Sequence, residues 1–269
     1  MIKPKATVRR FIRFFSLNLW GNLPSAWQRA LSKGYAQVYN KSYSRLIIGP
    51  YCKFNYKDPS YLTQFKPASG KNTYQNFQDF FTRVYKEPLQ ISCSAAWPCE
   101  GLLCEYGKVS DTKLVTVKGQ KRHLRNVFGE LGNSIPDHYY FSNVFLHNNN
   151  YHRIHSPVSG TITHIEHIPG DLVVLRPWIY KNDPSLPALR NERINVAIQS
   201  KNNKQWFLSI VGGPAVGTIV MAQTLAHGSM VKIGEELATF LLGSTCCIAS
   251  PLPIQHASVG QQVTVGKPL

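Results

Sequence analysis

The chain lacks acidic residues at its beginning: Asp58 is the first, whereas residues 1–57 contain eleven lysines and arginines. Over its 269 residues it carries a formal net charge of +16 at pH 7. A basic block of this kind favours an anionic partner such as a membrane lipid, a nucleic acid or an acidic protein. The length allows one large domain or two small ones with a hydrophobic core.

Several patterns that would point to a function are also missing. No apolar run approaches the roughly 18 residues needed to span a bilayer. None of the six cysteines forms a Cys-x-x-Cys pair, and the adjacent Cys246 and Cys247 would face opposite sides of a strand. The glycine-rich stretch at 212–217 lacks the lysine of a phosphate-binding loop. We therefore expect no metal site, and cysteines that are small buried side chains in a reducing compartment.

The first 45 residues have helical periodicity. Aromatic and aliphatic side chains alternate with arginines in VRRFIRFFSLNLW, the pattern breaks at Gly21 and Pro24, and a second helix is expected through Trp27 and Leu31. An aromatic, basic amphipathic segment is typical of a helix lying in a membrane interface. A mitochondrial transit peptide, or a helix packed on the domain with a solvated basic face, also fits the pattern.

The rest of the chain predicts an α+β fold, with amphipathic N-terminal helices followed by a mainly antiparallel β domain. Residues 46–75 have the composition of a linker, and YQNFQDFFTRVYKEPL (74–89) has helical spacing that Pro88 ends. From residue 91 onward, short apolar runs punctuated by glycine indicate strands, among them GLLCEYG, YYFSNVFL, GDLVVL, RINVAIQ and QWFLSIVG. We divide the chain into residues 1–73, a membrane-association segment and linker, and residues 74–269, the β domain.

Near the C-terminus, FLLGSTCCIA (240–249) places Gly243, Ser244 and Thr245 inside an apolar stretch. A bulge where two backbones approach would explain these small residues. A chemical explanation is that the Gly243–Ser244 bond is itself a substrate. A serine hydroxyl needs a base before it can attack, and that base needs a partner that fixes its tautomer.

Candidates for the base and its partner lie upstream. YHRIHSPVSG (151–160) contains His152 and His155, and histidine is the side chain most easily used as a base near neutral pH. PCEG (98–101) places Glu100 in a tight turn, where its carboxylate could also simply cap the turn.

Together these motifs resemble the phosphatidylserine decarboxylase proenzymes. YHRIHSPVSGTI is similar to the family's Tyr-His-Arg-x-His-x-Pro-x-x-Gly, LGST (242–245) to its cleavage motif, and PCEG to its Pro-x-Asp-Gly. FQDFFTRVYKEP, KGQKRHLRNVFG, RNERI, VGGPAVGTI and the terminal VGQQVTVGKPL also have counterparts, so that the resemblance covers about residues 75–269.

The resemblance implies a self-cleaving enzyme that converts phosphatidylserine into phosphatidylethanolamine and CO2. Ser244 would attack the carbonyl of Gly243 and become a covalent pyruvoyl group, leaving a heterodimer of the chains 1–243 and 244–269, which could itself dimerise. His155 would be the base for cleavage, Glu100 its orienting partner, and His152 would assist decarboxylation. The pyruvoyl ketone would condense with the substrate amine and withdraw electrons as CO2 leaves.

Two departures from the family pattern bear on these expectations. Position 100 holds glutamate where the family has aspartate, and the sequence after the Pro-Gly turn at 169–170 lacks the family's usual Ser-Val-Asn. A non-cleaving lipid-binding homologue and a pyruvoyl decarboxylase of a soluble amino acid therefore remain alternatives. A lipoyl-carrier-like β sandwich lacks the exposed hairpin lysine, and a nucleic-acid partner fits poorly with basic residues interleaved with an apolar face.

The implied location is peripheral, on an anionic phospholipid membrane. The cytoplasmic face of a bacterial cell membrane is expected, and the mitochondrial inner membrane is the alternative. Anionic leaflets attract lysine and arginine by about 1 kcal/mol each.

Overall fold

The computed structural model describes residues 6–180, 182–214, 219–241 and 243–269. The helices are α1 (Ala6–Phe14), α2 (Ser25–Tyr39), α3 (Ile48–Asn55), α4 (Phe77–Phe81) and α5 (Leu186–Arg190), joined by several short 3₁₀ and π segments. The strands are β1 (Phe65–Lys66), β2 (Val84–Tyr85), β3 (Gly101–Lys108), β4 (Leu114–Val117), β5 (Gln120–His123), β6 (Tyr140–Leu146), β7 (Arg153–His155), β8 (Gly160–Ile168), β9 (Arg193–Ser200), β10 (Gln205–Gly212), β11 (Ile219–Met221), β12 (Met230–Val231), β13 (Glu236–Phe240), β14 (Ser244–Ser250) and β15 (Gln262–Val263).

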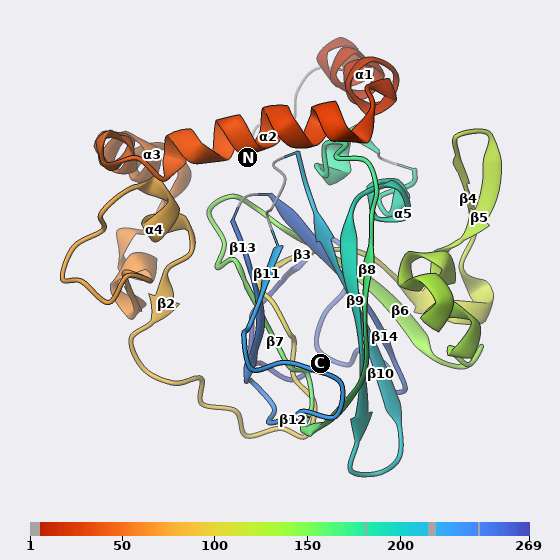
Figure 1. Cartoon of the computed structure of the whole chain (residues 1–269). Helices are drawn as coiled ribbons and strands as arrows, with labels where there is room; N and C mark the ends of the chain where they lie inside the picture. The colour runs from red at the N-terminus through yellow and green to blue at the C-terminus, as the bar shows by residue number, and fades with distance from the viewer. Residues whose placement is uncertain (1–5, 181, 215–218, 242) are drawn as a thin grey trace.

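The strands form an antiparallel β domain with the long helix α2 lying across one end of it (Figure 1). An eight-stranded sheet has the order β12-β8-β9-β10-β14-β6-β3-β15, and a three-stranded sheet has the order β11-β13-β7. Every strand pairing between these elements is antiparallel. The expected α+β class is therefore confirmed.

Two hydrophobic cores lie on opposite faces of the eight-stranded sheet. One contains Ile154 of β7 and Phe240 of β13 and fills the space between the two sheets. The other lies under the 3₁₀ segment Leu124–Ser134 and α5. Strand β14 is central and buried along its whole length, and Cys246 enters the first core while Cys247 enters the second. The predicted opposite facing of the two cysteines is confirmed, and all six cysteines are free thiols.

The N-terminal helices break where the sequence indicates. The π segment Phe15–Leu19 and the 3₁₀ turn Trp20–Asn22 follow α1, and α2 begins after Pro24. A Cβ added to Gly21 would lie 2.7 Å from the carbonyl oxygen of Ser16, so only glycine allows this turn to close.

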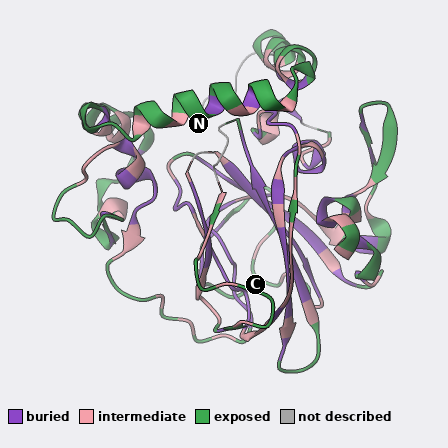
Figure 2. Ribbon diagram, viewed as in Figure 1, coloured by how far each residue is buried: buried purple, intermediate pink, exposed green. Residues whose placement is uncertain are grey.

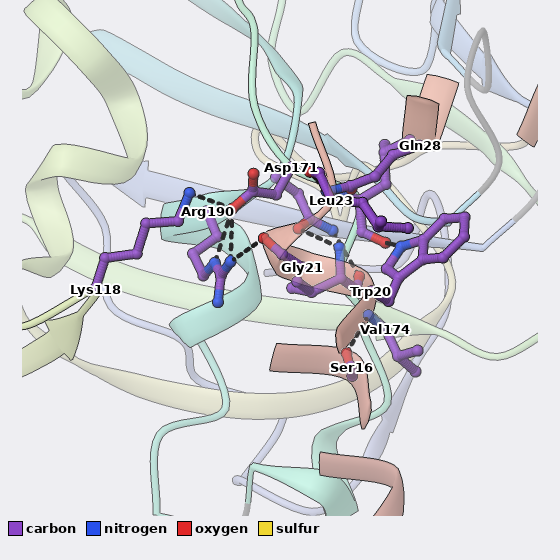
Figure 3. Close-up of polar contacts among 12 residues, drawn as sticks. Ser16, Trp20, Gly21, Leu23, Gln28, Lys118, Asp171, Val174 and Arg190 are labelled. Atoms are coloured by element: carbon purple, nitrogen blue, oxygen red, sulfur yellow. Dashed lines mark hydrogen bonds and ion pairs between the residues drawn. The ribbon is translucent and has the colours of Figure 1, made fainter. Parts of the chain in front are cut away.

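Polar contacts fasten the N-terminal segment to the loop that follows β8 (Figure 3). The Trp20 indole donates to the Leu172 carbonyl at 2.8 Å, and the Leu172 amide donates to the Gln28 side chain, also at 2.8 Å. The Val174 amide donates to Ser16 Oγ at 3.0 Å. Ser16 and Gln28 are fully buried, so this part of the segment belongs to the packed structure.

An ion-pair cluster stabilises the same junction (Figure 3). Arg190 donates to the Gly21 carbonyl at 2.9 Å and to the Asp171 carboxylate at 2.9 Å. Lys118 lies 2.9 Å from the same carboxylate. The carboxylate of Asp171 thus connects the β4–β5 hairpin, α5 and the N-terminal turn.

Three local predictions were wrong. Residues 46–75 are not an open linker, because α3 and the 3₁₀ segment Pro59–Gln64 pack their aromatic side chains against Phe77, Phe80 and Phe81. The helix expected over 74–89 is limited to α4, because the chain then turns into β2, which pairs with β1. GDLVVL (170–175) is a loop instead of a strand, since its backbone bonds the N-terminal segment.

Candidate active site

Ser244 begins the central strand β14, where it pairs with Gly212 on one side and with Leu146 on the other. Its side chain is completely buried, and its hydroxyl has no hydrogen-bond partner among the described residues. Ser244 has the same parity along the strand as Cys246, so its side chain faces the core between the two sheets. An unpaired buried hydroxyl is costly to keep, and such groups concentrate where chemistry needs them.

The residue before the serine has a conformation that favours glycine. Gly243 has a φ of +37°, which L side chains rarely adopt. Its carbonyl packs against Gly213, where an added Cβ would lie 2.8 Å from the Gly243 oxygen. The two glycines therefore let the Gly243 carbonyl approach the neighbouring backbone closely. Leu242 of the LGST motif and residues 215–218 of VGGPAVGTI lie outside the described residues.

His152 lies directly before β7 and is fully buried. Its Nδ1 lies 2.8 Å from the carbonyl oxygen of Asn150, and since a carbonyl only accepts, Nδ1 carries the proton. Nε2 then holds a lone pair, and it has no partner among the described residues. Burial lowers the pKa of His152 to about 3, so the ring is neutral.

The position of His152 connects it to the serine. Alternation along the extended chain puts His152 on the same side as Ile154, which enters the core that Ser244 also faces. Its ring lies 4.0 Å from that of Phe81, and Phe81 and Gly243 line the same cavity.

His155 lies on the other face of β7, and both of its ring nitrogens are occupied. Nδ1 lies 2.7 Å from the Gly234 carbonyl oxygen, and Nε2 lies 3.0 Å from the Tyr151 hydroxyl. The carbonyl fixes the proton on Nδ1, so Nε2 accepts from the phenol. Burial lowers the pKa of His155, which keeps this ring neutral as well.

The Glu100 carboxylate bonds elsewhere than the sequence predicts. It accepts from the Tyr61 hydroxyl at 2.8 and 3.0 Å and from the Asn150 side-chain amide at 2.6 Å. The expected direct contact with a ring nitrogen of His155 is therefore not present. Burial raises the pKa of Glu100, and its hydrogen bonds oppose that shift.

Glu100 instead positions the turn that carries both histidines. Asn150 connects the carboxylate to His152, because its side chain donates to Glu100 while its carbonyl accepts from the His152 ring. Tyr151, the residue after Asn150, bonds the His155 ring through its hydroxyl.

A buried arginine completes this cluster. Arg83 donates to the carbonyls of Asn149 and Asn150 at 3.0 and 2.8 Å, and its guanidinium lies 4.8 Å over the Phe65 ring. Its charge opposes protonation of His152 and compensates the Glu100 carboxylate.

Sequence reasoning missed Tyr61, Arg83, Asn150 and Tyr151. Asn150 and Tyr151 directly precede His152, so their place beside the motif was the available signal. No sequence signal pointed to Tyr61, because it lies in the segment interpreted as a linker and reaches Glu100 only in the folded chain.

A cavity connects the surface under α2 with the residue before Ser244. Tyr35 and Tyr39 of α2, Phe77 and Phe81 of α4, and Gly243 line it, and its volume is about 250 Å³. A mainly apolar cavity that reaches the backbone next to a buried serine has the form of a ligand site.

Comparison with protein families matches residues 77–269 to the phosphatidylserine decarboxylase model. The chain belongs to the phosphatidylserine decarboxylase family. The matched region spans α4, both sheets and all four candidate residues, Glu100, His152, His155 and Ser244.

Curated relatives agree with this membership of the phosphatidylserine decarboxylase family. Proteins named phosphatidylserine decarboxylase proenzyme are 28% identical in Psychrobacter cryohalolentis, over 71% of this chain and 76% of that protein, and 29% identical in Methylobacillus flagellatus, over 66% and 70%. One from Pseudoalteromonas atlantica is 27% identical over 91% of this chain and 85% of its own length.

Proposed function

We propose that this chain is a self-cleaving phosphatidylserine decarboxylase whose Gly243–Ser244 bond is the cleavage site. Family membership supports the reaction class, a carboxy-lyase made as a proenzyme. The observation that carries the cleavage site is the buried Ser244 hydroxyl, which has no partner among the described residues and comes directly after a glycine at φ +37°.

The cleavage uses atoms of the chain itself and one water molecule. Ser244 Oγ attacks the Gly243 carbonyl carbon, the peptide C–N bond breaks, and an ester forms. Elimination then breaks the Ser244 Cβ–Oγ bond and releases residues 1–243 with a carboxylate. The dehydroalanine left at position 244 takes up water and releases ammonia, giving a pyruvoyl group.

The surroundings of residue 244 fit this group. The site is buried, a glycine precedes it, and a neutral imidazole nitrogen without a partner faces the same core. A pyruvoyl group supplies an electron-withdrawing ketone that reacts with an amine and stabilises the negative charge formed as CO2 leaves. The chain's own residues would hold the lipid headgroup there and exclude water.

The two histidines divide the proton transfers in our proposal. His155 takes the Ser244 proton during cleavage, as the family resemblance implies, and His152 supplies the proton that replaces CO2. Nε2 of His152 has no partner among the described residues, but it carries only a lone pair, so it must first take a proton from the substrate ammonium before it can give one to the carbon that loses CO2. His155 lies on the face of β7 away from the core that Ser244 faces, and its Nε2 is bonded to Tyr151, so cleavage requires the 151–155 segment to move.

Glu100 acts in this proposal as a positioning residue. Glu100→Asp withdraws the carboxylate by about 1.5 Å, so it can no longer hold Tyr61 and the 150–151 turn together. We expect cleavage to slow by about 100-fold, measured on a denaturing gel during cell-free synthesis. Glu100→Gln should slow it as well, because an amide N–H₂ in place of one carboxylate oxygen cannot accept from Asn150 or Tyr61.

Tyr61→Phe is the matched control, since it removes one hydrogen bond and leaves the acid in place. A smaller delay than that of Glu100→Asp, with an unchanged melting temperature, is expected. Wild-type cleavage rates in both Glu100 variants would show that the carboxylate only caps its turn.

The two product chains would stay together as a heterodimer. The 244–269 chain would contribute β14, between β10 and β6 in the centre of the eight-stranded sheet, and β15, at its edge beside β3. Removing a fully buried central strand would expose both cores, so cleavage leaves the fold assembled.

The N-terminal helices would place the enzyme on an anionic membrane, at the cytoplasmic face of the cell membrane. The outer surfaces of α1 and α2 are exposed (Figure 2) and include Phe11, Trp27 and Leu31. No helix in the described ranges is both long and apolar enough to cross a bilayer. Exposed aromatic and basic side chains on helices that lie across the domain suit interfacial binding.

We expect the combined substitution of Phe11, Trp27 and Leu31 by serine to release the protein from anionic liposomes, with cleavage unchanged. These side chains are 67%, 67% and 55% exposed, so the fold does not depend on them. Sedimentation with vesicles of phosphatidylglycerol and phosphatidylcholine measures the effect, and high salt should weaken wild-type binding. Leu114→Ser, an equally exposed leucine on the β4–β5 hairpin, is the control. Full binding by the triple variant would place the membrane surface elsewhere.

Intact mass spectrometry and a substrate comparison test the proposal against its alternatives. We expect two chains whose masses correspond to 1–243 and to a pyruvoyl-blocked 244–269, and CO2 release from phosphatidylserine. A single 269-residue mass would support the non-cleaving lipid-binding homologue. Release of CO2 from free serine but not from the lipid would support a soluble amino-acid substrate.

A further inference from the structure

Arg176 is an exposed cation at the end of the loop that passes under the N-terminal helices. Its guanidinium lies 5.2 Å from the centre of the Trp178 ring. None of the ion pairs formed within the described ranges includes Arg176. The stacked indole orients the side chain and leaves its N–H donors available for an anion.

Arg176 and Gly243 line the same cavity, which α2 also borders through Tyr35 and Tyr39. Arg176 is the one charged side chain among the described residues that line it. An anionic ligand that enters between α2 and the β domain therefore meets this guanidinium beside the residue that precedes Ser244.

The neighbouring histidine does not add a second cation. The ring of His147 stacks against Trp178, the residue that also contacts the Arg176 guanidinium, with 6.2 Å between the two ring centres. Burial, and then the charge of Arg176, lowers the pKa of His147 to about 4, so it is neutral under physiological conditions. Of Arg176 and His147, only Arg176 therefore carries a positive charge.

The backbone that carries Arg176 is held in place before any ligand arrives. Val174 bonds Ser16, and Leu172 bonds both Trp20 and Gln28 (Figure 3). The loop is thus bound to the segment proposed to contact the membrane. A guanidinium on a fixed backbone loses less freedom when it binds, which favours recognition of a specific group.

We propose that Arg176 binds the phosphodiester of the lipid substrate and so selects a phospholipid headgroup over a free amino acid. This inference rests on the proposed function. Phosphatidylserine offers two anions, the carboxylate and the phosphodiester. A cation on the carboxylate would stabilise the substrate more than the transition state, in which that charge leaves as CO2, whereas a phosphodiester contact persists throughout the reaction. Arginine also matches the geometry of phosphate oxygens.

Arg176→Ala tests the contact. Self-cleavage should be normal, KM for phosphatidylserine in neutral detergent micelles should rise about tenfold, and kcat should change less than twofold. Arg176→Lys should recover part of the loss. Lys121→Ala, which removes an exposed charge of the β4–β5 hairpin that does not line the cavity, should match wild type. An unchanged KM in Arg176→Ala would overturn the proposal.

Inhibition by the product shows which of the two substrate anions, the phosphodiester or the carboxylate, Arg176 binds. Phosphatidylethanolamine keeps the phosphodiester and lacks the carboxylate, so its inhibition constant should rise by the same factor as KM in Arg176→Ala. A raised KM with unchanged product inhibition would assign Arg176 to the carboxylate and overturn the inference. Failure of the wild-type protein to decarboxylate the lipid at all would instead remove the proposed function itself.

Discussion

Ser244→Ala is expected to yield a single intact chain with no decarboxylase activity. The substitution removes both the nucleophile that breaks the peptide bond and the atoms from which the pyruvoyl group forms. The fold should persist, because the hydroxyl has no hydrogen-bond partner among the described residues to lose. A denaturing gel, intact mass and CO2 release from phosphatidylserine measure the three outcomes.

Ser250→Ala is the matched control for that variant. Ser250 lies at the other end of the same buried strand, and its hydroxyl donates to the Leu252 carbonyl at 2.7 Å. Cleavage and activity should survive there, although a buried hydrogen bond is lost. A 1–243 fragment from Ser244→Ala would exclude the self-cleavage mechanism.

The histidine variants should separate cleavage from decarboxylation. We expect His155→Ala to remain uncleaved or to cleave at least about 100-fold more slowly, because an unassisted hydroxyl is a poor nucleophile. His152→Ala should cleave and then decarboxylate poorly, since the imidazole proposed to supply the proton is gone. Time courses of cleavage, followed by activity assays on the cleaved fraction, measure each step separately.

The reverse result would reassign the two residues. If His152→Ala stays intact while His155→Ala cleaves, then His152, whose Nε2 needs no rearrangement, is the base that activates Ser244. Tyr151→Phe gives an independent test, because it frees Nε2 of His155 without removing the ring. Faster cleavage in that variant is expected if His155 is the base, and an unchanged rate would argue against it.

The amino-acid sequence by itself determined the α+β class, the break between the N-terminal helices, the facing of Cys246 and Cys247, and the four candidate residues. These depend on information within a few neighbouring positions: helical spacing that stops at Gly21 and Pro24, strand alternation, and motifs such as YHRIH that are contiguous in the chain. Such patterns can be recognised without knowledge of the fold, because each depends on local geometry.

Only the tertiary structure decided how those residues are connected. Tyr61 reaches Glu100 from 39 positions away, and Leu172 gives its backbone bonds to the N-terminal segment instead of a strand. The physical reason is that a buried carboxylate or backbone amide must find a hydrogen-bond partner wherever folding brings one. The family resemblance implied a direct pair of Glu100 and His155, but in the folded chain Glu100 bonds Asn150 and His155 bonds Tyr151.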